Sequence, residues 1–243
     1  MRDYQSEFDK RVAYIRAKLQ EAHAGGIVFG NSGGKDSALV GILCKAACDN
    51  TLGVIMPCAS KVNYGQDKDD GNALAEMFHI ETRTVDLTAV REAELKALEG
   101  VVVLNDMALT NIAPRLRMTT LYTIAAAENR LVAGTGNRSE IYMGYFTKWG
   151  DGASDFNPIA DLTATEVFEF LRFLNAPASI VEKAPSAGLY EGQTDEQEMG
   201  VTYRAIDGFL TGEAIAEKDM AVIDRFHSRS EHKRRPISTF ENP

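Results

Sequence analysis

Long hydrophobic runs are missing from this sequence of 243 residues. No apolar segment approaches the roughly 20 residues that a helix needs to cross a bilayer, so we expect no contact with a membrane. The amino-terminal residues are mostly charged or polar, and no apolar segment follows them. This pattern predicts that the chain carries no signal peptide.

Basic charge and cysteine are also scarce. The chain has 26 Lys and Arg against 35 Asp and Glu, a net charge of −9, which argues against a nucleic acid bound through a broad basic surface. The three cysteines, Cys44, Cys48 and Cys58, form no Cys-x-x-Cys pair and have no histidine nearby. We interpret them as buried small hydrophobes rather than metal or redox groups, and expect a reducing, cytoplasmic location.

What the sequence does contain is an alternation of short apolar segments with longer helical ones. Hydrophobic content of 44% is ordinary for a globular protein, and the length suits a single domain over residues 1–243. The predicted strands are 26–29, 51–57, 81–87 and 131–134. Repeated strand–helix–strand units predict an α/β fold, a doubly wound parallel sheet flanked by helices, with ligands at the carboxyl ends of its strands.

The longer segments of the chain are predicted to be helices. The predicted helices are 3–23, 38–48, 67–78, 89–98, 111–129 and 163–174. Pro114 is expected in the first turn of its helix, where proline is tolerated, and Thr163 with Glu166 forms a capping-box pattern. Residues 144–160 and 186–200 are expected to be long loops, and residues 201–227 helical with glycine breaks.

Residues 26–37 are the most informative stretch. An apolar, β-branched run leads into Ser-Gly-Gly-Lys-Asp-Ser at 32–37 and then directly into a helical segment. Glycines let backbone N–H groups approach an anion, and the helix start adds partial positive charge. The spacing fits neither the Walker loop nor the dinucleotide-binding glycine pattern. The alternative is a glycine turn that only joins a strand to a helix.

This run resembles the pyrophosphate loop of the ATP pyrophosphatases. That superfamily cleaves ATP between its α and β phosphates and adenylates an oxygen of the substrate. Five further stretches, including Gly-Tyr-Phe-Thr-Lys-Trp-Gly-Asp-Gly at 144–152, are similar to one of its families, NAD synthetase, and the resemblance covers nearly the whole chain. The other stretches are 111–122, 134–140, 185–189 with 194–196, and 232–234.

The resemblance implies a fold and a reaction. The fold would be the Rossmann-like one of the adenine nucleotide alpha hydrolases. ATP would adenylate the nicotinate carboxylate of deamido-NAD, and ammonia would then displace AMP to give NAD. The chain has no room for the glutaminase domain of some members, so it resembles the ammonia-dependent form. Members of the family are homodimers with the deamido-NAD site at the subunit interface.

The resemblance also implies an ATP site with magnesium. The positions that match ATP contacts are Gly30, Asn31, Ser32, Gly33, Gly34, Lys35, Asp36, Ser37, Thr135 and Ser186. Asp36 and Glu140 match the carboxylates that bind Mg²⁺, which favours few protein carboxylates together with phosphate oxygens. The alternative for both is an acid stabilised at a helix start, and Thr135 can be read as plain turn chemistry.

A second group of residues matches deamido-NAD contacts and the chemical step. The substrate positions are Arg115, Lys148, Asp155, His232 and Lys233. Asp151 matches a carboxylate proposed to take the proton of ammonia, and Lys148 is expected to be a second catalytic residue. Asp151 can also be read as a turn aspartate, and Arg115 or the nearby Arg117 as a surface arginine.

One position departs from the family pattern. The family frequently has a lysine that reaches ATP where this chain has Ala164. An alanine cannot reach a phosphate, so we hypothesise that Lys35, or Arg234 or Arg235 in the basic tail, supplies the missing charge.

Two alternatives to this reading stay open. One is another ATP pyrophosphatase that adenylates a different carboxylate or carbonyl substrate. A tRNA thiolase would require catalytic cysteines and a basic surface, and a GMP synthetase a separate dimer domain. The other is a non-catalytic adenine-nucleotide module, which would not need the carboxylates Asp36, Glu140, Asp151 and Asp155.

Overall fold

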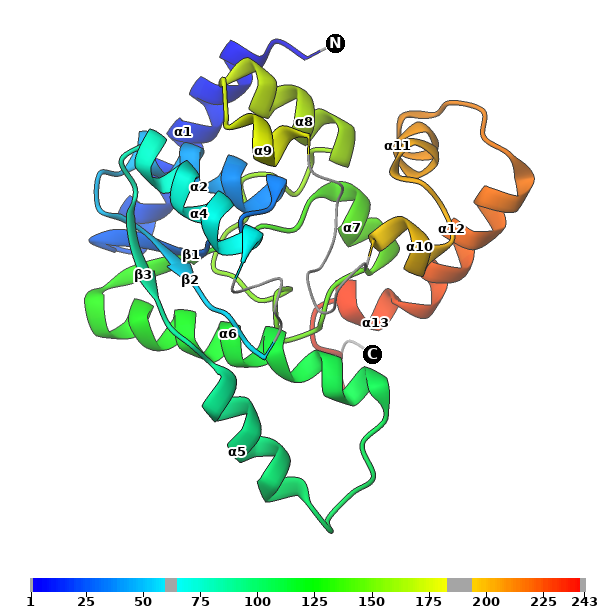
Figure 1. The fold of residues 1–243 in the computed structure, drawn as a ribbon. Helices are drawn as coiled ribbons and strands as arrows, with labels where there is room; N and C mark the ends of the chain where they lie inside the picture. The colour runs from blue at the N-terminus through cyan, green and yellow to red at the C-terminus, as the bar shows by residue number, and fades with distance from the viewer. Residues whose placement is uncertain (1, 60–64, 183–193, 241–243) are drawn as a thin grey trace.

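A four-stranded parallel sheet forms the centre of the computed structural model, which describes residues 2–59, 65–182 and 194–240 (Figure 1). The strands β1 (Gly26–Gly30), β2 (Thr51–Ile55), β3 (Glu81–Thr84) and β4 (Arg130–Ala133) lie in the order β3-β2-β1-β4. Val28 of β1 pairs with Leu52 on one side and Val132 on the other. The predicted parallel sheet is confirmed, with β2 and β3 shorter than expected.

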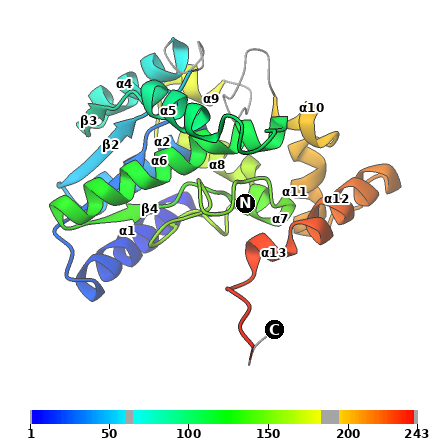
Figure 2. The ribbon, with the colours of Figure 1, turned by 90° about the horizontal axis from the view of Figure 1, so that it is seen from below.

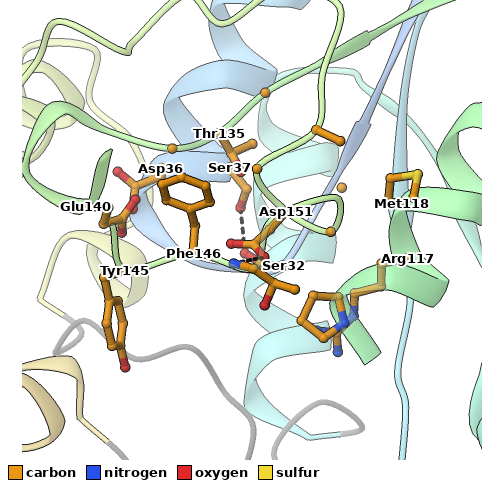
Figure 3. A pocket seen from close by; sticks show the side chains of 18 of the residues that line it. Ser32, Asp36, Ser37, Arg117, Met118, Thr135, Glu140, Tyr145, Phe146 and Asp151 are labelled. Carbon is orange, nitrogen blue, oxygen red and sulfur yellow. Dashed lines mark hydrogen bonds between the residues drawn. The ribbon is translucent and has the colours of Figure 1, made fainter. Parts of the chain in front are cut away.

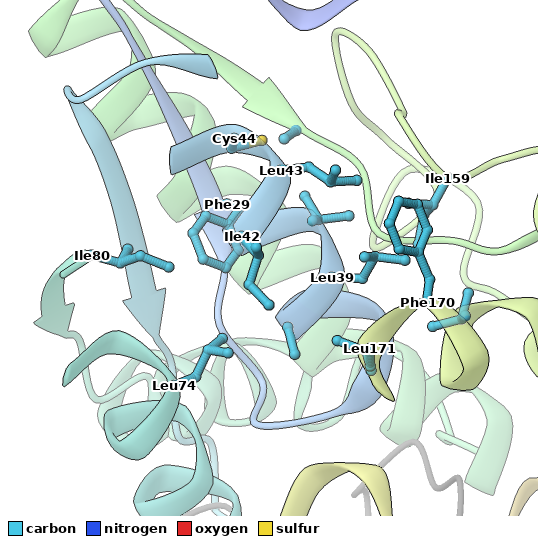
Figure 4. Packing of buried hydrophobic residues seen from close by; sticks show 14 of the residues in the cluster. Phe29, Leu39, Ile42, Leu43, Cys44, Leu74, Ile80, Ile159, Phe170 and Leu171 are labelled. Carbon is cyan, nitrogen blue, oxygen red and sulfur yellow. The ribbon is translucent and has the colours of Figure 1, made fainter. Parts of the chain in front are cut away.

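Alternate residues of β1 pack against different helical layers because successive side chains in a strand point to opposite faces. Ile27 and Phe29 join a fully buried cluster with α1 (Tyr4–Glu21), α2 (Lys35–Ala47) and α8 (Ala164–Phe173) (Figure 4). Cys44 belongs to this cluster, and all three cysteines of the chain are free. α4 (Gln66–Met77) covers the same face through Leu74.

The other face is covered by α6 (Asp106–Glu128), which contributes Ala113 and Ala125 to a cluster around Val28. This helix begins earlier than predicted because the side chain of Asn105 accepts a hydrogen bond from the N–H of Ala108 and caps it. Pro114 therefore lies inside the helix, and its predicted place in the first turn is wrong. α5 (Thr88–Leu98) precedes α6 and extends away from the sheet (Figure 1).

The sheet has a switch point between β1 and β4. From β1 the chain proceeds outward through β2 to β3, and then returns by α6 to place β4 on the other side of β1. Loops after neighbouring strands diverge at such a point and leave a crevice at the carboxyl ends. The loops after β1 and β4 are the two that carry the predicted phosphate and metal residues.

Most of the remaining helices form a carboxyl-terminal lobe beside the sheet (Figures 1 and 2). They are α7 (Arg138–Met143), α10 (Asp195–Met199), α11 (Tyr203–Thr211), α12 (Glu217–Arg229) and α13 (Glu231–Arg234), whereas the short α9 (Ala178–Val181) packs with α2 and α8. Met143, Tyr203, Ile206 and Ile223 pack together in its core. The glycine break is confirmed at Gly212, whereas α10 lies within a segment predicted to be loop. None of the helices in the described ranges has the length and apolar character that a bilayer crossing requires.

Candidate active site

A large pocket opens at the carboxyl ends of β1 and β4 (Figure 3). Its walls come from the loop after β1, the first turns of α6, the loop after β4, residues 144–154 and the tail around α13. The pocket therefore lies at the switch point of the sheet, where ligands of open α/β sheets bind. Segments far apart in the sequence meet there.

The loop at residues 30–37 forms one wall, and its conformation requires glycine. Gly33 has a φ of +72°, and a Cβ there would lie 2.1 Å from the carbonyl oxygen of Asp67. The hydroxyls of Ser32 and Ser37 lie 3.0 Å apart, and Ser37 donates to the carbonyl of Gly34. Asn31 fixes the base of the loop by donating from Nδ2 to the carbonyl of Gly71 at 2.9 Å.

Asp36 and Glu140 come together over Asn137, and we call them the carboxylate pair. Asn137 donates from Nδ2 to Oδ1 of Asp36 at 2.9 Å and from its backbone N–H to Oε2 of Glu140 at 3.1 Å. The other oxygen of each carboxylate faces Lys35, whose Nζ lies 2.5 Å from Asp36 Oδ2 and 3.8 Å from Glu140 Oε1. One oxygen of each carboxylate thus converges on a single cation.

The charges around the carboxylate pair do not balance. Burial and the charge of Asp36 raise the pKa of Glu140 to about 8, with a smaller contribution from Asp195. Burial opposes the charge of Lys35, but the charges of Asp36 and Glu140 outweigh it and raise the pKa of its ammonium. The raised pKa of Glu140 shows that ionisation of both carboxylates of the pair is unfavourable beside a single ammonium, and a further cation would favour the ionised form of both.

Asp151 lines the pocket from the turn that follows α7, and its Oδ1 accepts the N–H of Thr147 at 2.9 Å (Figure 3). Thr147 is itself held by a hydrogen bond of 2.6 Å to Asn111 of α6. The side chain keeps an open edge to solvent, yet the dense protein around it raises the pKa of its carboxyl, against the N–H of Thr147 and the charge of Lys233.

The tail closes the pocket through α13. The ammonium of Lys233 donates to the carbonyls of Gly144 and Phe146, at 2.9 and 2.7 Å, and lies 5.4 Å from the Phe146 ring centre. Burial lowers the pKa of this ammonium. His232 lines the same pocket. The predicted tail residues 232 and 233 are therefore brought to the pocket by contacts with residues 144–146.

Three predicted substrate residues lie outside the pocket that the described residues form. Arg115 is exposed and donates to the carbonyl of Lys148 at 3.4 Å. The ammonium of Lys148 lies 5.4 Å from the Trp149 ring and donates to the carbonyl of His232 at 2.5 Å. Asp155 accepts from Tyr122 and from the N–H of Val132. They lie around the pocket rim and the exposed side of α6.

The other predicted ATP positions do not all lie in the described part of the pocket. Thr135 and most residues of the 30–37 loop line the pocket, whereas Ser186 lies outside the described residues. Ala164 is buried, and its N–H donates to Ser139 Oγ at 3.1 Å. Arg235 pairs with Glu231 at 2.7 Å, and Arg234 donates to the carbonyl of His227, so both tail arginines are engaged near α12.

Sequence reasoning missed several residues of the site. Arg117, rather than Arg115, lines the pocket, and its Nε donates to the carbonyl of Met56 at 3.0 Å. Asn137 organises the carboxylate pair, and its capping box with Glu140 is visible in the sequence as Asn-x-x-Glu. Asp195 was part of a recognised motif without an assigned role, and only the fold brings it toward Lys35.

Comparisons with known proteins agree with this geometry. The sequence profile described as NAD synthase matches residues 7–237. The NH(3)-dependent NAD(+) synthetase of Carboxydothermus hydrogenoformans is 47% identical over 237 residues, covering 96% of each chain. A solved structure of NMN synthetase from Francisella tularensis has a TM-score of 0.93 and 40% identity, covering 98% of this chain and 99% of that one. The NH3-dependent NAD synthetase of Campylobacter jejuni, solved with nitrate, has a TM-score of 0.79 and 28% identity, covering 99% and 100%.

Proposed function

Because the chain belongs to the NAD synthase family, we propose that it amidates deamido-NAD with ammonia at the expense of ATP. The products are NAD, AMP and pyrophosphate, and the chain is a ligase that forms a C–N bond. A carboxylate resists attack by ammonia until one of its oxygens becomes a good leaving group, and AMP is such a group. Another ATP pyrophosphatase activity is not favoured, since relatives of 45–47% identity over nearly the full length carry the ammonia-dependent name.

The observation that carries the proposal is the meeting of the glycine loop and the carboxylate pair at the switch point. Ser32, Gly34 and Ser37 of the loop line the pocket, and α2 begins directly behind Gly34. Asp36 and Glu140 stand beside the same loop. Positioning and charge neutralisation are what phosphate displacement needs from a protein. In this proposal residues 30–37, Thr135 and Ser186 hold ATP.

We further propose magnesium as the metal, held by Asp36 and Glu140. In the described parts of the chain, no group of three or more His, Cys, Asp and Glu side chains is arranged to hold a metal ion. Mg²⁺ does not need such a group, because one or two carboxylates with phosphate oxygens and water suffice. The convergent oxygens of the carboxylate pair fit it, as does the repulsion by Asp36 that, with burial, raises the pKa of Glu140. When bound, the metal would neutralise charge that develops on the phosphates.

Asp151 is the proposed proton acceptor for ammonia in the second half-reaction. Its carboxyl lines the pocket, and the N–H of Thr147 orients it. His232 and Lys233 are proposed to close over deamido-NAD from the tail. Lys148, joined to the carbonyl of His232, is proposed to position this closure and to contact substrate.

We propose that the protein acts as a cytoplasmic homodimer of single-domain chains. Arg115 and Asp155 lie outside the pocket of their own chain, which supports a deamido-NAD site completed by a second subunit. The exposed side of α6, which carries Arg115, is then the contact surface. The three free thiols support a reducing compartment.

Nicotinate mononucleotide is a second candidate for the amidated substrate. It is favoured by the solved NMN synthetase with a TM-score of 0.93. Both acceptors present the same nicotinate carboxylate to ATP, so the chemistry above is unchanged. They differ in the adenylate half, which only deamido-NAD carries.

One assay tests both the reaction and the substrate. Purified protein is given ATP and Mg²⁺ with either acceptor, and with either ammonium or glutamine as the nitrogen source. We expect amide and AMP to form in equal amounts with ammonium and not with glutamine. The ratio of kcat/KM for the two acceptors then identifies the substrate. ATP binding without amidation of either acceptor would overturn the proposal and require a screen of other carboxylates.

A further inference from the structure

Lys35 has an unusual place for a residue of a phosphate-binding loop. Its side chain is almost fully buried, with 5% of its surface exposed. The rings of Phe168 and Tyr203 lie 5.7 and 5.4 Å from Nζ. A buried ammonium is stable only beside negative charge, and this one contacts Asp36 and Glu140.

The geometry of the carboxylate pair determines which of its oxygens contact Lys35. Asn137 holds one oxygen of each carboxylate, Oδ1 of Asp36 and Oε2 of Glu140. The two remaining oxygens, Oδ2 and Oε1, both face Nζ of Lys35. Those same oxygens are the ones left to bind a metal. The ammonium and a divalent cation therefore compete for one position.

We propose that the Lys35 ammonium serves as an internal counter-ion that occupies the cation position of Asp36 and Glu140 until a divalent cation and ATP enter together. The inference rests on the proposed metal site at the carboxylate pair. When the cation binds, the ammonium moves from the carboxylates toward the pocket, which Lys35 also lines. There the phosphates of ATP replace the two carboxylates as the negatively charged partners of the ammonium.

This arrangement couples the two ligands. A cation that binds alone must displace the ammonium from its carboxylates into a place without compensating charge. With ATP present, the displaced ammonium gains phosphate partners, so the cation binds more tightly. Coupling of this kind is reciprocal, and the cation must strengthen ATP binding by the same factor. The lysine thus keeps the carboxylates from repelling each other before ATP arrives and makes metal loading depend on nucleotide.

The test measures binding of Mn²⁺, a paramagnetic substitute for Mg²⁺, by the loss of the free-ion electron paramagnetic resonance signal. It is run with and without an ATP analogue that has a methylene bridge between the α and β phosphates. We expect Lys35→Met to bind Mn²⁺ about tenfold more tightly than wild type without the analogue, since one competing charge is gone. The gain in Mn²⁺ affinity on adding the analogue should shrink correspondingly.

Three variants control this result. Lys35→Arg keeps the charge and should bind Mn²⁺ as weakly as wild type. Lys45→Met removes a lysine from the same helix, where Nζ contacts the carbonyl of Asp49 instead, and should have no effect. Adding Asp36→Asn to Lys35→Met should abolish the gain. If Lys35→Met fails to fold, Lys35→Gln provides the same comparison.

Two failures are distinguishable. If Lys35→Met binds Mn²⁺ no more tightly than wild type while Asp36→Asn abolishes nucleotide-dependent binding, the metal site stands and the counter-ion role is overturned. If Asp36→Asn and Glu140→Gln leave nucleotide-dependent Mn²⁺ binding unchanged, the proposed metal site itself is wrong.

Discussion

Asp151 is held at the pocket wall by the backbone of Thr147, and the protein around it raises the pKa of its carboxyl. A general base works best when its pKa approaches the operating pH. We expect Asp151→Asn to lower kcat with ammonia by about 10²–10⁴-fold, with little change in KM for ATP, because the amide keeps the shape but cannot take a proton. Steady-state kinetics check this expectation.

The pH dependence of the same variant tests whether the Asp151 carboxyl is the group that takes the proton. The ionised form is the base, so wild-type kcat/KM should fall as the pH falls through the raised pKa of Asp151. Asp151→Asn should lack this acid limb when free ammonia is held constant. Asp49→Asn, at an exposed position just after α2, should retain it. An acid limb that survives in Asp151→Asn would assign the proton transfer to another group.

At the scale of elements, α1 is fastened to the loop before α8 by one buried arginine. Arg11 donates to both oxygens of Asp161, at 2.7 and 2.8 Å, and to the carbonyl of Pro158. Removing it leaves a buried carbonyl unpaired, whereas the half-exposed Asp161 regains water. We expect Arg11→Ala to lower the free energy of unfolding by about 1–3 kcal/mol at pH 7, measured by urea denaturation.

The sign of the pH dependence follows from Asp161. Burial opposes its ionisation, but the hydrogen bonds and charge of Arg11 prevail and lower its pKa in the folded protein. The contribution is therefore complete above the unfolded pKa of about 3.9 and is lost as the pH falls through the folded pKa. The difference between wild type and Arg11→Ala should shrink in acid. Lys10→Ala, on the exposed side of α1, should show neither effect, and an equal loss in both variants would refute this role of Arg11.

At the scale of the whole molecule, the proposed dimer predicts a mass of twice 26.6 kDa in sedimentation. It also predicts complementation between variants defective in different halves of the site. Asp36→Asn and Arg115→Ala should each have low activity as pure dimers. If Arg115 serves the pocket of the partner, half of randomly mixed dimers are hybrids, and each hybrid has one intact site. An equimolar mixture should then regain about a quarter of wild-type activity.

The activity of the mixture shows whether Arg115 serves the pocket of its own chain or that of the partner. If Arg115 served the pocket of its own chain, each hybrid would hold two defective sites and the mixture would stay inactive. Mixing Asp36→Asn with Glu140→Gln is the matched control, because both residues belong to one pocket and no hybrid has an intact site. Recovery in this control would contradict the assignment of the carboxylate pair to a single chain.

Much of the sheet could be predicted because β1, β2 and β4 are short, mainly apolar runs, whereas the polar β3 was indicated by its alternating character. Val28 and its neighbours in β1 are apolar on both faces, as a strand covered by helices requires. The start of α6 was misplaced because Pro114 suggested a first turn, while the cap of Asn105 lay further upstream. α10 was missed because five residues give too little periodicity for a prediction.

Some features of the site could likewise be predicted from neighbouring residues, whereas others depend on the fold. Ser-Gly-Gly-Lys-Asp-Ser predicted the loop because part of its glycine requirement is local: Gly33 has a φ of +72°, which glycine adopts without strain. The contact of Glu140 with Lys35 spans more than one hundred residues, and nothing local specifies it. Arg115 and Arg117 are two positions apart on one helix, and which of them faces the pocket depends on how α6 is rotated against the sheet.

The sequence by itself determined the fold class, the anion loop and the resemblance to a family, because each depends on the order and spacing of neighbouring residues. Only the tertiary structure decided that Lys35 lies on the carboxylates Asp36 and Glu140. That choice depends on burial and on charges brought together from separate loops. Electrostatic energy in a protein is set by distance and desolvation, and neither quantity is present in a linear chain.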